Sequence, residues 1–339
     1  MVHSAKQTLA RWATGIPSGD PAQVVVVSAT EQAARARAAG LATADATVLA
    51  PTDGDGVSWH YDGGVVEPYA EVVVDDSFVL QVVPYALGRY TPIGGPTLLR
   101  VTEVSDLEAY LADADDAVAS GTFSALVAGP STLLADEPAL GGWSGDGGPE
   151  QRLWVAADGA VSTGPWGARL GDVDSSLEEV TLAWQAAQEG RVPCAVALSA
   201  AVADDVRDAA LRARPWLGRY LRAVGALRGL AGRGRDGVRV SGFGGHLDPA
   251  LDGAADATAD DAPVLCWDED QAYLSNGAAR RTVQISHELA TVVEKLMVLG
   301  PEASEAVPAT EAERVSAYFA QAGFRLGTSS SRPTVTVGG

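Results

Sequence analysis

The sequence predicts an α/β protein in which a mixed sheet precedes a smaller C-terminal module. Three observations predict this class. An apolar run at residues 23–28 is followed by a helix pattern and a second apolar run, the rhythm of a parallel β-α-β unit. Between residues 57 and 99 the apolar positions recur with a period closer to two, as in half-buried β-strands. After residue 262, three short strand patterns precede three helix patterns.

Composition and charge narrow the class of protein. Hydrophobic residues make up 47% of the 339 residues and charged residues 20%, which is typical of globular domains. The net charge of −20 disfavours binding to nucleic acid or to anionic lipid. The N-terminus lacks the apolar core of a signal peptide, and no apolar run is long enough to span a membrane. We therefore expect a cytoplasmic protein.

Residues 1–140 are predicted to form an N-terminal α/β subdomain. Its expected helices lie at residues 5–12, 30–39 and 105–119, and its expected strands at residues 23–28, 46–49, 71–75, 78–83 and 97–101. No GxGxxG or GxxxxGK[ST] motif follows the first strand, so no dinucleotide or P-loop site is predicted.

Residues 141–247 are predicted to form a second α/β subdomain. It begins with a glycine-rich loop at residues 141–148, which we interpret as a surface loop. The remaining expected elements are a β region at 154–161, a helix at 175–189, a strand at 192–198 and a helical stretch at 200–230 interrupted at Pro215.

An arginine-rich helical segment carries positive charge on this acidic chain. Nine arginines and two aspartates lie between residues 207 and 239, which gives 9 − 2 = +7. One interpretation is a solvated helix face that pairs with acidic neighbours, and the other is a docking surface for an acidic peptide or a partner enzyme. The candidate partner-docking residues are Arg207, Arg212, Arg214, Arg219 and Arg222.

Residues 248–262 are predicted to be an acidic linker, because they hold five aspartates, six alanines and no lysine or arginine. The C-terminal module then spans residues 263–328, and residues 329–339 form a flexible tail. Within the module we expect strands at 264–267, 271–274 and 280–285. Ser286 caps a helix with an apolar stripe over residues 289–297; a short helix at 302–306 and a last helix at 309–322 follow.

This order of elements resembles the PqqD-like RiPP recognition element, a winged-helix module that captures the leader of a ribosomally made precursor peptide. In that family the leader adds as a further strand at the sheet edge, beside the last helix. The resemblance implies that the strand pairs with the peptide and that the last helix lines the site. The implied peptide-binding residues are Arg281, Thr282, Val283, Gln284, Ile285, Arg314, Val315, Tyr318 and Phe319.

The whole architecture is similar to the recognition proteins of daptide-type clusters, which are rich in arginine and poor in lysine. The present chain has 22 arginines and 2 lysines. The resemblance implies a non-catalytic protein that presents a precursor peptide to partner enzymes, such as a dehydrogenase that oxidatively decarboxylates a C-terminal threonine.

No catalytic, cofactor or metal site is predicted. The GxSxG and HExxH motifs are missing, and neither cysteine belongs to a CxxC pair. Two alternatives stay open, namely a peptide-modifying enzyme with a fused recognition element and a winged-helix transcription regulator. Against DNA binding, the module carries five basic and nine acidic residues.

Overall fold

A computed structural model describes residues 5–16, 22–74, 78–141, 148–189, 191, 195–254, 258, 262–276 and 281–326. The chain divides into two compact units, residues 1–113 with 125–221 and residues 114–124 with 222–339. Two of the three divisions fall within helices, α4 (Val104–Ser120) and α8 (Leu217–Ala231), and the third falls between residues 124 and 125. The mixed α/β class is confirmed.

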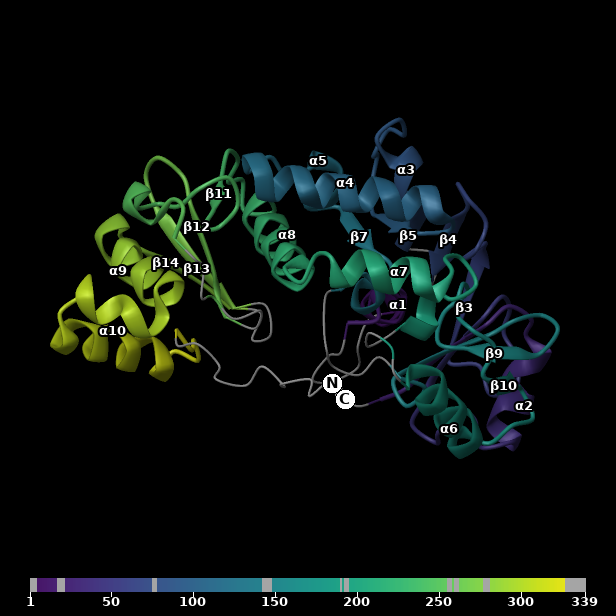
Figure 1. Ribbon diagram of the computed structural model, residues 1–339. Helices are drawn as coiled ribbons and strands as arrows, with labels where there is room; N and C mark the ends of the chain where they lie inside the picture. The colour runs from purple at the N-terminus through teal and green to yellow at the C-terminus, as the bar shows by residue number, and fades with distance from the viewer. Residues whose placement is uncertain are drawn as a thin grey trace. The chain divides into compact units, whose positions relative to one another are not determined.

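The first unit contains one mixed sheet of ten strands in the order β10-β9-β8-β1-β2-β3-β4-β5-β6-β7 (Figure 1). These strands are β1 (Val24–Val27), β2 (Thr47–Ala50), β3 (Trp59–Gly63), β4 (Glu71–Val74), β5 (Phe78–Pro84), β6 (Thr97–Arg100), β7 (Thr132–Leu134), β8 (Arg152–Val155), β9 (Ala160–Ser162) and β10 (Gly171–Asp172). Strand β1 pairs in parallel with β2 and with β8, so the predicted parallel pair is confirmed. Because β8 lies beside β1, the expected boundary between residues 140 and 141 does not separate two sheets.

The helices of this unit are α1 (Ala5–Thr14), α2 (Glu31–Ala38), α3 (Tyr85–Gly88), α5 (Ala125–Ala128), α6 (Leu177–Gln188) and α7 (Asp204–Arg212), with 3-10 helices η1 (Glu137–Leu140) and η2 (Ala195–Leu198). All four valines of β1 are fully buried because both sheet faces are covered. On one face Val24 and Val26 belong to a cluster with Trp12 of α1, and on the other Val25 and Val27 pack in a cluster with alanines of α2.

The prediction of a strand at residues 192–198 is wrong for the residues that the structure describes. Residues 195–198 form η2, and residues 192–194 lie outside the described part of the chain. A short buried apolar run fits a strand or one helical turn equally well, so its pattern could not separate the two. The expected interruption at Pro215 is confirmed, since α7 ends before it and α8 begins after it. Most of the glycine-rich loop, residues 142–147, also lies outside the described residues.

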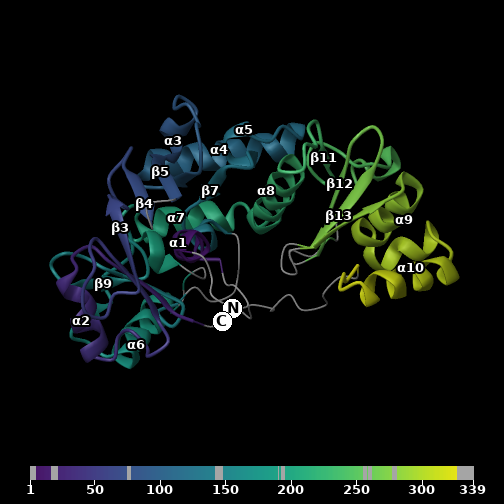
Figure 2. The ribbon, with the colours of Figure 1, turned by 180° about the vertical axis from the view of Figure 1, so that it is seen from behind.

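The second unit contains an antiparallel sheet in the order β11-β12-β13-β14. Its elements are β11 (Arg239–Val240), β12 (Val264–Trp267), β13 (Ala272–Asn276), β14 (Arg281–Ile285), α9 (His287–Val298), α10 (Ala309–Gln321) and the 3-10 helices η3 (Pro249–Leu251) and η4 (Gly300–Glu305). Helices α9 and α10 lie on the same side of β12–β14 in both views (Figures 1 and 2). The expected cap is confirmed, as Leu289 N donates to Ser286 Oγ at 3.3 Å.

The start of the predicted acidic linker is structured. Residues 249–251 form η3, and Leu251 is 3% exposed. The backbone N–H groups of Leu247 and Asp248 donate to the carboxylate of Glu294, each at 2.8 Å. Composition could not reveal these bonds, because the acceptor comes from α9. Residues 255–257, 259–261 and the tail at 329–339 lie outside the described residues.

Among the helices that the structure describes, none is both long enough and apolar enough to cross a membrane.

Candidate functional site

Strand β14 lies at the edge of the four-stranded sheet. It pairs with β13 on one side, with Leu274 opposite Val283 and Asn276 opposite Arg281. Among the described strands, none pairs with its other side. The predicted strand at 280–285 is thus confirmed over residues 281–285, and its outer edge is open to a further strand.

In an antiparallel sheet, the backbone N–H and C=O groups of successive residues point alternately to the two sides of the strand. This alternation shows which backbone groups of β14 face the open edge. In the β12–β13 hairpin, Asp268 N donates to Gln271 O at 3.0 Å, so residue 271 and every second residue after it face β12. Residues 272, 274 and 276 therefore face β14 and bond to their partners there. By the register, the backbone N–H and C=O groups of Thr282 and Gln284 point away from the sheet, toward the open edge.

The side chains of β14 divide between the two sheet faces. Val283 and Ile285 are partly buried and pack against the core formed with α9 and α10. On the opposite face the hydroxyls of Thr282 and Ser275 lie 3.3 Å apart. The strand is thus fixed by its side chains while its outer main-chain groups stay available.

Two residues of α10 that were expected to line the peptide site belong to the core. Val315 is 5% exposed and Phe319 is fully buried, with the Phe319 ring 6.1 Å from that of Phe324. Both side chains therefore pack in the core, and their contact with a peptide stays a prediction. The periodicity located the apolar face of the helix correctly, but that face meets α9 and the sheet.

The other two predicted residues of α10 face solvent. Tyr318 is 62% exposed, and the side chain of Arg314 is 79% exposed with Glu311 3.8 Å away. An exposed tyrosine beside a buried phenylalanine presents an apolar ring with a polar end, which suits a binding surface.

Two contacts that the sequence did not reveal join β14 and β13 to the end of α10. Arg281 Nη1 donates to Ala322 O at 2.9 Å, and Asn276 Nδ2 donates to Gly323 O at 2.9 Å. Both satisfy carbonyls that a helix C-terminus leaves without partners. Arg281 therefore fixes the helix beside the strand, which differs from its expected contact with peptide. In the sequence, Gly323 predicted where the helix ends, but it did not reveal which side chains bind the carbonyls at that end.

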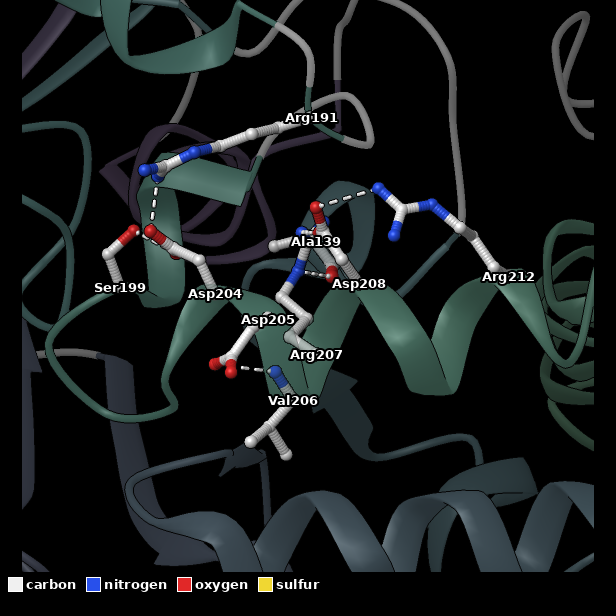
Figure 3. Close-up of polar contacts among 9 residues, drawn as sticks. All are labelled: Ala139, Arg191, Ser199, Asp204, Asp205, Val206, Arg207, Asp208 and Arg212. Atoms are coloured by element: carbon white, nitrogen blue, oxygen red, sulfur yellow. Dashed lines mark hydrogen bonds and ion pairs between the residues drawn. The ribbon is translucent and has the colours of Figure 1, made fainter.

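The arginine-rich segment is not one exposed surface. Arg207 is fully buried, and its Nε donates to Ala139 O and its Nη1 to Asp208 Oδ1, both at 2.7 Å (Figure 3). Arg219 is 7% exposed. The folded chain buries both side chains, so neither belongs to an exposed surface, and their docking role stays a prediction.

The remaining predicted docking arginines are at least partly accessible. The side chain of Arg212 is 62% exposed, and its Nη2 lies 3.4 Å from Asp208 Oδ2. Figure 3 shows the Arg212 guanidinium directed toward the Asp208 carboxylate. Arg214 and Arg222 are half-buried, and Arg214 Nη1 lies 3.4 Å from Ala210 O. Arg222 belongs to the second unit, whereas the other two belong to the first.

In the described part of the chain, no group of three or more histidine, cysteine or carboxylate side chains could hold a metal ion. A search of protein-family models, curated proteins and solved structures found no match to this chain. The edge strand β14 and its surroundings are therefore the features of this chain that bear on its function.

Proposed function

We propose that this protein is a leader-peptide-binding adaptor, which captures a ribosomally made precursor peptide and presents it to partner modifying enzymes. The observation that carries the proposal is the open edge of β14, where Thr282 and Gln284 direct main-chain donors and acceptors outward. Three strands followed by α9, η4 and α10 suit a winged-helix recognition element. A peptide-modifying dehydrogenase is the expected kind of partner enzyme, and the cytoplasm the expected location.

Strand addition explains how such a site combines affinity with selectivity. Main-chain hydrogen bonds to Thr282 and Gln284 would bind a peptide of any sequence. The peptide's alternate side chains would face the surface beside the strand and supply selectivity. Exposed Tyr318, one turn before the Ala322 carbonyl that binds Arg281, offers that surface an aromatic contact.

The proposal is tested by fluorescence anisotropy of labelled peptides encoded by short reading frames beside the gene, titrated against the full chain. Gln284→Pro removes an outward N–H that the sheet does not use, whereas Gln284→Ala keeps it. We expect the proline variant to weaken binding at least tenfold and the alanine variant to bind like the unchanged protein.

A proline at Val283 would instead remove an N–H that bonds to β13, so it would report on sheet stability and not on the peptide contact. Circular dichroism melting of each variant separates these effects. If no peptide binds the full chain, or if Gln284→Pro binds normally, the adaptor proposal is wrong. Salt-sensitive binding of duplex DNA would favour a transcription regulator.

A further inference from the structure

The first unit encloses a cluster of three charged side chains. Arg100 closes β6 and is 1% exposed, Asp136 follows β7 and is 1% exposed, and Arg152 opens β8 and is 5% exposed. Strands β6 and β7 are parallel, so Arg100 and Asp136 both lie at the carboxyl edge of that part of the sheet. Ligands of open α/β sheets bind at such edges.

The charges in this cluster do not balance. Arg152 Nη1 lies 2.8 Å from Asp136 Oδ1 and donates to Trp12 O, at the C-terminal end of α1, at 3.0 Å. The helix end and the carboxylate therefore accommodate Arg152. Arg100 is left as a second buried guanidinium, and an arginine does not lose its proton to relieve burial.

Several buried polar atoms of the cluster have no hydrogen-bond partner within the described residues. The donors are Arg100 Nε, Arg100 Nη1 and Arg152 Nε, and the acceptor is Asp136 Oδ2, because Asp136 Oδ1 already pairs with Arg152 Nη1. Buried polar groups in folded proteins are otherwise almost always bonded, so such a set points to a ligand or to water. Burial lowers the pKa of Arg100, with Asp136 opposing that effect and Arg152 adding to it.

Two backbone features adjoin the cluster. Asp136 has φ 53°, a left-handed conformation that costs a non-glycine residue energy and is often found at functional sites. Gly15 lies directly over Arg152, since a Cβ there would be 2.6 Å from Arg152 Cζ. Of the three charged residues, Arg152 alone also lines a recess, together with Trp12, Gly15 and Gln151.

We propose that the Arg100–Asp136–Arg152 cluster binds a small oxyanion that carries a hydroxyl group. Its negative oxygens accept from Arg100 Nε and Nη1 and from Arg152 Nε, and its hydroxyl donates to Asp136. Protonated inorganic phosphate and small hydroxycarboxylates share this chemistry. The cluster belongs to the first unit and β14 to the second, so this proposal does not rest on the proposed peptide binding.

The test is thermal unfolding of the full chain titrated with phosphate, glycolate, lactate or malate, with sodium chloride at matched ionic strength. A ligand of the folded state raises the unfolding temperature in a saturable way. We expect saturation with at least one of these anions and none with chloride. Phosphate and hydroxycarboxylate titrations distinguish the two sources of the oxyanion.

Arg100→Met should weaken the effective anion at least tenfold, while Arg35→Met should leave it unchanged, because Arg35 is exposed and pairs with Asp174. If Arg100→Met does not fold, Gly15→Ala serves instead, since its methyl group would displace the Arg152 guanidinium. Absence of saturable stabilisation by every anion tested would overturn the proposal and assign the cluster to a hydrated structural role. Equal stabilisation of Arg100→Met and the unchanged protein would also overturn it.

Discussion

Ser241 donates its hydroxyl proton to Glu294 Oε1 across 2.6 Å, and this bond joins the end of β11 to helix α9. Glu294 is fully buried, and its carboxylate also accepts the N–H groups of Leu247 and Asp248. Three donors thus satisfy one buried charge. The loop between β11 and η3 is therefore held by the helix that covers the sheet.

Replacing Glu294 with alanine should destabilise the second unit by at least ~3 kcal/mol, because three buried donors would lose their acceptor. Ser241→Ala should cost about 1 kcal/mol, since it removes one of the three bonds. Hydrogen exchange of the β11–β13 amides in the full chain measures both effects locally. The control is Glu288→Ala, at an exposed position of α9; a loss there equal to that of Glu294→Ala would contradict the argument.

The two arginines that flank Asp208 should respond very differently to substitution. Arg207→Met leaves a buried carboxylate without its closest partner and should cost about 3 kcal/mol of unfolding free energy. Arg212→Met removes an exposed partner at 3.4 Å and should cost less than ~1 kcal/mol. Urea unfolding of the two variants measures this difference. Equal losses would mean that Arg207 behaves as a surface residue.

Buried tyrosines should make the first unit sensitive to alkali. Burial raises the pKa of Tyr61, and it raises the pKa values of Tyr85 and Tyr110 well above their ordinary value, with Tyr220 adding to both. The folded protein therefore keeps protons that the unfolded chain releases. Stability is fully present below about pH 10 and falls above it by about 1.4 kcal/mol per pH unit for each such tyrosine.

Tyrosinate absorbance at 295 nm and urea unfolding between pH 8 and pH 11 test this expectation. Tyr110→Phe loses the bond to Leu140 O, so it should be less stable at neutral pH. Its stability should then decline with pH less steeply than that of the unchanged protein, because it has one fewer buried phenol. Parallel declines would show that Tyr110 ionises without unfolding.

The sequence predicted those parts of the fold that rest on local pattern. The valine run of β1 was confirmed as a strand buried on both faces, and the alternating pattern of β14 was confirmed as a strand. The interruption at Pro215 was confirmed because proline lacks the N–H that a helix needs. By contrast, η2 was expected as a strand, because four buried apolar residues carry no period of their own.

The candidate site was only partly predictable, for a physical reason. A helical period shows that Val315 and Phe319 share a face, but it does not show whether that face meets a core or a ligand. Likewise, the sequence alone does not show that Arg207 and Glu294 are buried, because their hydrogen-bond partners come from elements distant in sequence. The backbone groups of Thr282 and Gln284 point outward because of the register in which β14 pairs with β13. The residue types at these positions do not specify that register.

Two glycines of the second unit should tolerate alanine to very different extents. Gly323 has φ 84°, and a Cβ there would meet only Arg281 Nη1 at 3.7 Å, so Gly323→Ala should cost about 1 kcal/mol of backbone strain. Gly244 has φ 67°, and a Cβ there would lie 2.3 Å from Gly121 N and from Ser120 C. Those atoms are backbone and cannot rotate away, so Gly244→Ala should cost at least ~3 kcal/mol. Thermal unfolding of the full chain ranks the two variants, and hydrogen exchange at residues 118–124 localises the change. If Gly244→Ala were as stable as Gly323→Ala, the close approach between the end of α4 and the turn after β11 would not exist in solution.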